Sequence, residues 1–200
     1  MEKPAWRVRS SSVVVDSPHL RLRKDELELP DGTVLAEYFV RESRGYVMIF
    51  PFTTDGRVVL VRQYRYGSDS VTLEFPAGTL DDGEAPEACA RRELLEETGF
   101  SCSRLEALPE LYAEPARSPA INYCFIAHDA QRTHEPRPGI GEVIETEILD
   151  LETLWAILRA GSLDSIACAS IGYRALERLG YLTAGFDRSI GRNASSEPKG

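Results

Sequence analysis

The chain has 200 residues, of which 42% are hydrophobic and 28% charged, as expected of one globular domain or one domain with a small appendage. Its formal net charge of −9 disfavours general binding to nucleic acids or anionic membranes, because no basic excess exists to displace phosphate counterions. The apolar runs are too short to span a bilayer, the N-terminal residues lack a secretory signal, and the four cysteines show no CxxC spacing. We therefore expect a cytoplasmic protein with reduced thiols and with no nucleic-acid or membrane partner.

Residues 1–45 alternate polar and apolar side chains, which is the pattern of half-buried β-strands. The sequence PDG at 30–32 marks a tight turn between two of these strands. So short a segment cannot bury a core of its own, although SVVVD and AEYFV supply a set of apolar residues. We expect a small β-domain that forms part of a homodimer interface.

A second block of the chain, residues 46–185, begins after Gly45. Two strands within 46–66 are joined at Asp55-Gly56, which suits a hairpin turn, and the run VVLV at 58–61 predicts a central strand covered on both faces. A helix is expected from about Glu84 to Thr98, with Pro86 in its first turn and Gly99 just past its end.

The remainder of this block predicts strands near 105–112, 121–128 and 142–149, followed by two closing helices in LETLWAILRAG and SIACASIGYRALERLG. Residues 186–200 are polar, and we expect them to be disordered. The predicted order of elements is therefore strands, one helix, further strands and two helices.

The predicted helix at 84–98 concentrates acidic residues. Glu93, Glu96 and Glu97 are spaced as i, i+3 and i+4 and share one helix face, where like charges repel. A solvated acidic face is the ordinary explanation. However, Arg92 lies one turn before Glu96, where it can hold a carboxylate, and several hard oxygen ligands facing one point are what Mg²⁺ binds. The pattern favours a metal site that acts on phosphates.

These residues resemble a known family motif, the Nudix box, without a departure: Gly78, five residues, Glu84, seven residues, Arg92-Glu93-Leu94, one residue, Glu96-Glu97, one residue, Gly99-Phe100. From about residue 20 to residue 180, including LVRQYRYG and LEFPAG, the chain also resembles the ADP-ribose and ADP-sugar pyrophosphatase branch of that family. The resemblance implies an α+β fold: a Nudix α/β/α sandwich with a mixed sheet, preceded by a small antiparallel β-domain that commonly dimerises.

The resemblance also implies roles for residues of the box. The main metal ligands are expected to be Glu93 and Glu97, assisted by Glu96 and by the backbone carbonyl of Ala77. The cofactor is expected to be Mg²⁺, with Mn²⁺ as an alternative. Arg92 is expected to orient the glutamates. The lack of a side chain at Gly78 is expected to permit the loop geometry, and Glu84 is either an outer ligand or a structural partner of Arg92.

The loop after the box bears on the catalytic base. Pro115 follows Phe100 by 15 residues, as is typical of ADP-ribose pyrophosphatases, but Ala116 and Ala120 stand where many relatives have a glycine and a glutamate. A second acidic loop, GEVIE, offers Glu142 or Glu145 as the base or as a further metal contact. We favour Glu142; otherwise the two are a loop charge and the exposed side of a strand.

Arg62 and Arg65 end the predicted central strand and point to opposite faces of it, so one of them can clamp a phosphate with its planar fork. The resemblance favours Arg65, and the alternative is a solvated arginine at a strand end. No ring residue stands out as a partner for the base of a nucleotide. The candidates are Trp6, His19, Tyr38 and Phe39.

The predicted function is Mg²⁺-dependent hydrolysis of the diphosphate in ADP-ribose or a related nucleoside diphosphate sugar, giving AMP and a sugar phosphate. One alternative is the hydrolysis of GDP-mannose or another nucleoside diphosphate sugar, which the same box can support. A non-catalytic sensor of nucleotide sugars is an alternative of another class, although a sensor has no need of all four glutamates.

Overall fold

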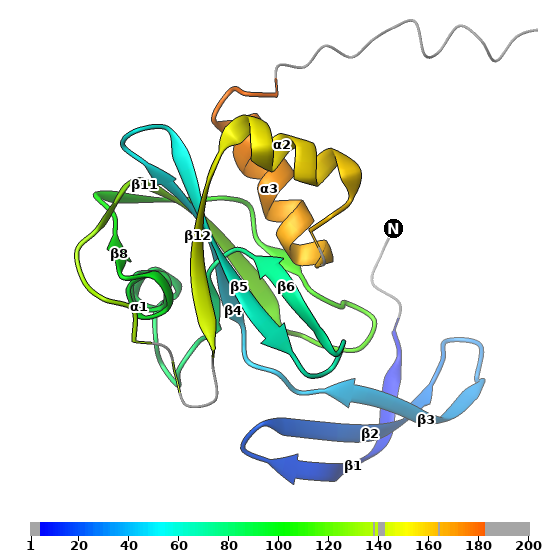
Figure 1. The fold of residues 1–200 in the computed structure, drawn as a ribbon. Coiled ribbons are helices and arrows are strands. Elements are labelled where there is room, and N and C mark those ends of the chain that lie inside the picture. The colour runs from blue at the N-terminus through cyan, green and yellow to red at the C-terminus, as the bar shows by residue number, and fades with distance from the viewer. Residues whose placement is uncertain (1–4, 138, 140–142, 164, 183–200) are drawn as a thin grey trace, which may run out of the picture.

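The computed structural model describes residues 5–137, 139, 143–163 and 165–182, which form two separate β-sheets (Figure 1). The first sheet is antiparallel and three-stranded, in the order β1 (Arg7–Ser17), β2 (Leu20–Glu28) and β3 (Val34–Arg41). Gly32 adopts φ +84° in the PDG turn between β2 and β3, a conformation that favours glycine. The expected N-terminal antiparallel sheet is confirmed.

The second sheet is mixed and has nine strands among the described residues. Its centre is in the order β11-β4-β5-β12, with β4 and β11 parallel and the other central pairs antiparallel. Its strands are β4 (Tyr46–Thr53), β5 (Arg57–Arg65), β6 (Ser70–Glu74), β7 (Ala77–Thr79), β8 (Phe100–Ser101), β9 (Arg104–Ala107), β10 (Leu111–Tyr112), β11 (Ile121–Arg132) and β12 (Ile144–Asp150).

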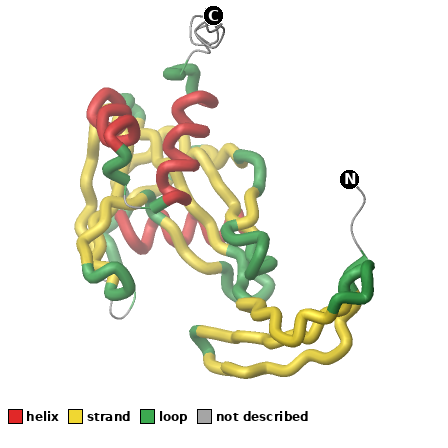
Figure 2. Tube along the Cα trace, turned by 90° about the vertical axis from the view of Figure 1, so that its right-hand side faces the viewer, coloured by secondary structure: helices red, strands yellow, loops and turns green. Residues whose placement is uncertain are grey.

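Helices cover both faces of this sheet, as Figures 1 and 2 show. Helix α1 (Pro86–Thr98) packs on one face, and helices α2 (Leu151–Ala160) and α3 (Ile166–Arg178) pack on the other. In β5, Val58 and Leu60 belong to the core beneath α2 and α3, whereas Val59 belongs to the core beneath α1. The apolar run therefore faces both layers, and the expected α/β/α sandwich with a covered central strand is confirmed.

Helix α1 begins and ends close to where the sequence predicts. It starts at Pro86 rather than at Glu84, because the preceding residues form a turn in which the Glu84 N–H donates to the Asp81 carbonyl (3.0 Å). Gly99 closes the helix with φ +74°, and its N–H donates to the Leu95 carbonyl (2.8 Å). Local chemistry therefore defines both ends of the helix.

The later strands differ from prediction in extent. The strand expected at 105–112 is divided into β9 and β10, since Pro109 lies between them and has no N–H for a sheet ladder. Strand β11 continues to Arg132, past an irregular pairing near Asp129, whose φ is +55°. Of the strand expected at 142–149, residue 142 is outside the described residues, and β12 runs on to Asp150.

The N-terminal sheet extends beside the sandwich as an arm (Figures 1 and 2). It meets the loop at 113–120 through the Tyr38 hydroxyl, which donates to the Ala116 carbonyl, and through the Arg41 N–H, which donates to the Arg117 carbonyl (2.8 Å). The Arg117 guanidinium also lies 4.9 Å from the centre of the Tyr38 ring. Every residue of β1 is exposed.

Two further expectations concern the membrane and the thiols. Within the described residues, no helix is both long enough and apolar enough to cross a membrane. The four cysteines are free thiols: Cys89, Cys124 and Cys168 are buried, and Cys102 is partly buried.

Candidate metal centre and active site

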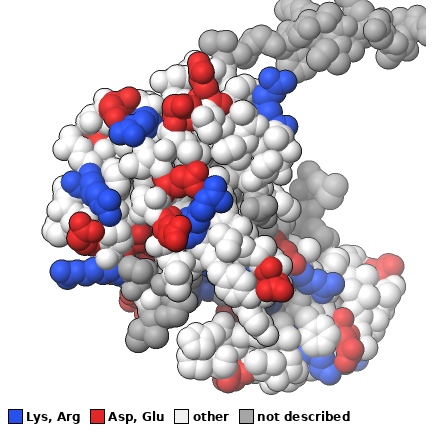
Figure 3. Space-filling model, in the orientation of Figure 1, with Lys and Arg blue, Asp and Glu red and all other residues white. Residues whose placement is uncertain are grey.

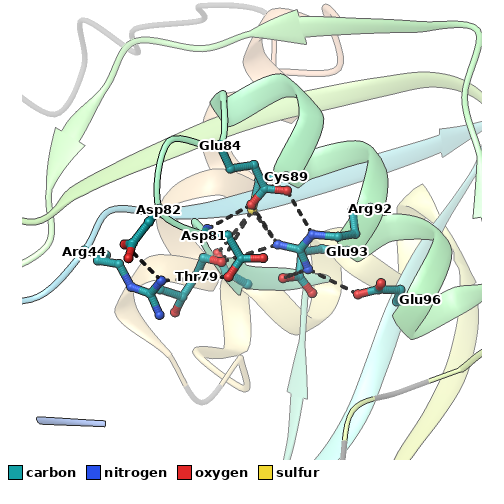
Figure 4. Close-up of polar contacts among 10 residues, drawn as sticks. Arg44, Thr79, Asp81, Asp82, Glu84, Cys89, Arg92, Glu93 and Glu96 are labelled. Carbon is teal, nitrogen blue, oxygen red and sulfur yellow. Dashed lines mark hydrogen bonds and ion pairs between the residues drawn. The ribbon is translucent and has the colours of Figure 1, made fainter. Parts of the chain in front are cut away.

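Arg92 is the centre of an ion-pair network on helix α1 (Figure 4). Its Nη1 donates to Glu93 Oε1 (2.7 Å) and to Glu96 Oε2 (3.2 Å), while its Nε donates to Glu84 Oε1 (2.9 Å). The hydrogen bond to Glu84 and those to the other glutamates raise the pKa of Arg92, so the guanidinium stays charged. This geometry supports the expected role of Arg92, which is to hold and orient the carboxylates.

Glu84 is bound to the protein through both carboxylate oxygens. Its Oε2 accepts from Arg92 Nη2 (2.9 Å) and from the Asp81 N–H (3.0 Å), in addition to the bond at Oε1. These hydrogen bonds, that from Arg92 first, lower the pKa of Glu84 to about 2. Because both oxygens of Glu84 are already hydrogen-bonded, the geometry favours Glu84 as a structural partner of Arg92 rather than as an outer metal ligand.

Gly78 leaves the space that Glu93 occupies. A Cβ at residue 78 would lie 1.9 Å from Glu93 Oε1, well inside a van der Waals contact. Glycine is therefore needed for close approach rather than for an unusual backbone angle. Strand β7 positions Gly78 by pairing antiparallel with β4, where it lies opposite Val47.

Ala77 and Glu97 meet although 20 residues separate them. The Ala77 N–H donates to Glu97 Oε2 (3.0 Å), and the Glu97 residue is only 5% exposed. In an extended strand the N–H and the carbonyl of one residue point toward the same edge. This geometry predicts that the Ala77 carbonyl lies on the side of β7 that faces Glu97, and its role as a metal ligand stays a prediction.

The residues of this site fit a hard divalent cation. The donor set consists of carboxylate and carbonyl oxygens, which such a cation prefers, and the missing side chain at Gly78 leaves room for the Glu93 carboxylate. Among the described residues, no group of three or more acidic, histidine or cysteine side chains is placed to hold a metal ion, so Glu93, Glu96 and Glu97 do not by themselves converge on one point. Mg²⁺ does not need a complete cage of side chains, because it usually keeps several waters and is bound by one or two carboxylates together with substrate phosphates.

A cavity of about 620 Å³ brings part of the box together with Arg65. Its lining includes Arg65, Ala77, Gly78, Arg92 and Glu93. Ser165 and Ala167, at the start of α3, also line it, so the cavity is formed between the two helical layers. Such a volume is within the range of small-molecule sites.

Arg62 does not lie in this cavity. It points to the other side of β5, where its Nε donates to Glu147 Oε2 of the neighbouring strand β12 (2.5 Å). Of the two arginines predicted from the sequence, the fold brings only Arg65 beside the box residues.

Arg44 is a candidate that sequence reasoning missed. It lines both the first cavity and a second one of about 390 Å³, which continues past Tyr46 and Thr79 toward the turn between β1 and β2. Its Nη1 is 3.5 Å from Asp82 Oδ1, and the Asp82 side chain is 97% exposed, so this pairing is weak (Figure 4). The only sequence signal was its place just before the second block of strands.

The second cavity contains one of the proposed base-binding residues. His19 lines it, together with Arg21 and Arg41. The other three candidates are not among the described residues that line either cavity; they are Trp6, Tyr38 and Phe39. Trp6 and Tyr38 instead contact each other edge to face, with ring centres 6.2 Å apart.

Comparison with protein families decides the identity of this site. The family model described as NUDIX domain matches residues 42–166, and the model described as nucleoside diphosphate sugar hydrolase N-terminal domain matches residues 6–40. This chain belongs to the Nudix family. Nudix hydrolases generally use a divalent metal ion, so the general part of the cofactor prediction holds.

Three curated relatives are similar to this Nudix chain over most of its length. The methanol dehydrogenase activator of Bacillus methanolicus is 30% identical over 161 residues, which are 79% of this chain and 86% of that protein. The ADP-ribose pyrophosphatase of Bacillus subtilis is 32% identical over 127 residues, 64% of this chain and 66% of that protein. The GDP-mannose pyrophosphatase of Klebsiella pneumoniae is 32% identical over 182 residues, 85% of this chain and 90% of that protein.

The fold is also similar to that of a solved hydrolase. A crystal structure of an ADP compounds hydrolase superposes with a TM-score of 0.76 at 25% identity, and covers 91% of this chain and 98% of its own. The prediction of a Nudix diphosphohydrolase of the nucleoside diphosphate sugar type is confirmed.

The predicted Nudix catalytic base, Glu142, lies outside the described residues. Before it, the Arg137 N–H donates to the Glu96 carbonyl (2.7 Å) of the box helix. After it, Glu145 is exposed on β12 and lies opposite Arg62, as expected for the outer side of an alternating strand. The described residues on either side are thus bound to the box helix and to β5.

Proposed function

We propose that this Nudix protein hydrolyses the diphosphate of ADP-ribose, or of a related nucleoside diphosphate sugar, to AMP and a sugar phosphate. The proposed cofactor is Mg²⁺, with Mn²⁺ as an alternative, because the donor set consists of hard oxygens. In this reaction the oxygen of a water molecule forms a new bond to one phosphorus. The bridging oxygen leaves with the other phosphate, and the two protons of the water go to the new phosphate monoester groups or to solvent.

One observation carries the proposal: Arg65 and Glu93 line the same cavity, although they come from β5 and α1. A cation bound by the carboxylates and a guanidinium across the cavity can engage the two phosphates of one diphosphate. The second cavity shares Arg44, Tyr46 and Thr79 with this one and therefore lies beside it, which leaves room for the groups attached to the diphosphate.

The residues have separate roles in this proposal. Glu93, Glu96, Glu97 and the Ala77 carbonyl would hold the cation, and Arg92 keeps the carboxylates in place. When bound, a divalent cation neutralises phosphate charge and activates water. Arg65 and Arg44 bind phosphate oxygens, for which the planar guanidinium is well suited. We assign this contact to Arg65 rather than to Arg62, which pairs with Glu147 outside the cavity.

A turnover screen tests the substrate and the metal together. We expect the purified protein with Mg²⁺ to convert ADP-ribose to AMP and ribose 5-phosphate, and to lose this activity when the metal is removed by EDTA. Products should be separated by anion-exchange chromatography. GDP-mannose, ADP-glucose and NADH should be measured in parallel under the same conditions.

The screen also separates the alternatives. Preferential turnover of GDP-mannose would move the substrate to the second candidate, which the relative from Klebsiella pneumoniae supports by its similarity over 90% of its length. Tight binding of ADP-ribose without turnover in the presence of Mg²⁺ would indicate a sensor instead. Absence of both binding and turnover for all four compounds would refute the proposed function.

We further propose that the protein is a homodimer whose interface includes residues 1–45. The observation behind this is the exposure of apolar side chains on the N-terminal sheet, where Val8 is 61% and Val14 is 45% exposed. Strand β1 is also an edge strand, which leaves backbone groups open to pairing. Burial of this surface against a second copy would remove apolar area from water.

Light scattering coupled to gel filtration tests the assembly. We expect a mass twice that of the chain at micromolar concentration, and a shift toward monomer when Val13 and Val15 are both replaced by lysine. Ile148→Lys on β12 is the control, since it replaces an exposed apolar residue of the other sheet by lysine. A monomeric native protein would contradict the proposal.

The expected cellular location and partners have some support. The four free thiols are typical of a reducing compartment, and we propose the cytoplasm. On the face shown in Figure 3, described basic side chains lie interspersed with acidic ones, which is unlike the continuous basic surface of a nucleic-acid-binding protein.

A further inference from the structure

Arg65 does not stand alone in the active-site cavity. Its Nε donates to Glu74 Oε1 (2.9 Å) and its Nη2 donates to Glu74 Oε2 (2.7 Å), so strands β5 and β6 are joined by a two-bond pair. A guanidinium paired in this way uses one edge of its fork. The hydrogens of Nη1 therefore point away from Glu74, and both residues line the cavity that contains Glu93.

Glu74 is the more firmly held member of the pair. Its side chain is 11% exposed, compared with 45% for Arg65. The Thr72 hydroxyl donates to Glu74 Oε1 (2.6 Å). Burial raises the pKa of Glu74, but the hydrogen bonds from Arg65 and Thr72 outweigh it and hold the pKa below its ordinary value. At neutral pH, Glu74 is therefore a charged and fixed support for a more exposed arginine.

We propose that Glu74 is a positioning residue for the substrate: it fixes Arg65 so that the free edge of the guanidinium meets a phosphate of the diphosphate. This inference rests on the proposed function, and it adds a residue that makes no contact with the reacting atoms. A free arginine loses side-chain entropy when it binds an anion, and a guanidinium already held in place loses less.

The opposite role for Glu74 would be competition, in which the carboxylate keeps Arg65 away from the phosphate. Two features argue against it. The pair leaves the Nη1 edge available, and Thr72 ties Glu74 to its own strand on β6. The two roles predict changes of opposite sign when Glu74 loses its charge, so one variant distinguishes them.

The chain offers a matched control on the same strand. Arg62 and Glu147 form an arginine–glutamate pair with one hydrogen bond on the other side of β5, and the Arg62 side chain is also 45% exposed. This pair lies outside the cavity that contains the box residues. Glu147→Gln therefore removes the same charge from an arginine on β5 without reaching the substrate.

The test compares Glu74→Gln and Glu147→Gln, using both the kinetics of ADP-ribose hydrolysis with Mg²⁺ and calorimetric titration of ADP-ribose. A glutamine at residue 74 has one acceptor oxygen, and its NH2 group would face the second N–H of Arg65. Two donors cannot bond to each other, so the two-bond pair is lost. We expect kcat/KM to fall roughly 10- to 100-fold, mainly through KM, because a hydrogen bond to a charged group is worth about that factor. Glu147→Gln should behave as the native protein does.

A double-mutant cycle with Arg65→Ala shows whether the effect passes through the arginine. With Arg65 removed, Glu74→Gln should change kcat/KM by no more than about twofold. Full additivity of the two losses, or an unchanged or raised kcat/KM in Glu74→Gln, would overturn the inference. Thr72→Val keeps both charges and removes one support of Glu74, so it should give a smaller loss of the same sign if Glu74→Gln does not fold.

The outcomes also separate this inference from the proposed function. If the native protein and Glu147→Gln turn over ADP-ribose and Glu74→Gln matches them, only the role of Glu74 is refuted. If the native protein neither binds nor hydrolyses any of the four compounds, the proposed function fails, and the role of Glu74 fails with it.

Discussion

Replacing Glu97 by glutamine is expected to lower kcat by ~10²–10³-fold, the usual cost of removing one group that stabilises charge in a transition state. The substitution removes a negative charge from the predicted ligand set. The fold should persist, because the amide oxygen of glutamine can still accept the hydrogen bond from the Ala77 N–H. We expect the affinity for Mg²⁺, measured by calorimetric titration, to fall as well.

The control for this prediction is Glu87→Gln on the same helix. Glu87 is exposed in the first turn of α1, so its replacement removes the same charge from the helix without touching the ion-pair network around Arg92. Circular dichroism should give both variants the native helical signal. A folded Glu97→Gln protein with near-native turnover would show that Glu97 is not a metal ligand.

Replacing Glu142 by glutamine is expected to reduce kcat by ~10²–10⁴-fold, the range for loss of a general base. KM should change less, because a base that activates or positions water acts chiefly in the transition state. The reason for choosing Glu142 is that the loop ARSPAIN has no carboxylate, so the base is expected from another acidic loop. Five residues before Glu142, the Arg137 N–H donates to the Glu96 carbonyl of the box helix.

Glu145→Gln is the control for Glu142, since it removes a charge three residues away on an exposed strand position. The pH dependence of kcat should lose its acidic limb in Glu142→Gln and keep it in Glu145→Gln. If Glu145→Gln is the damaging change, the base lies on β12 itself. If neither variant loses activity, either the metal alone generates the nucleophile or Glu96 supplies the base from the box.

The regular parts of the site could be predicted because they depend on local geometry. A helix with 3.6 residues per turn places Glu93, Glu96 and Glu97 on one face whatever the surrounding fold. The same rule puts Arg92 one turn from Glu96, and in the structure Arg92 Nη1 lies 3.2 Å from Glu96 Oε2. Pro86 and Gly99 determined the ends of α1 in the same way, through a missing N–H and a left-handed φ.

Other features could not be predicted because they depend on which segments meet. Strand alternation put Arg62 and Arg65 on opposite faces, but only the packing of β5 between its neighbours decides which face borders the cavity. The pairing of Arg65 with Glu74 likewise requires the register of β6 against β5. Arg44 belongs to no sequence motif, and only the structure shows that it lines both cavities.

By itself, the sequence determined the family, with its general use of a divalent metal, and the α/β/α order of elements, since motif spacing and hydrophobic periodicity act over a few residues. Only the tertiary structure showed which residues meet in the site. It showed that Glu84 holds Arg92 and that the missing side chain at Gly78 leaves room for the Glu93 carboxylate. Those partners are 8 and 15 residues apart, and their approach is set by how β7 packs against β4 and α1, a close-packing constraint that no local pattern encodes.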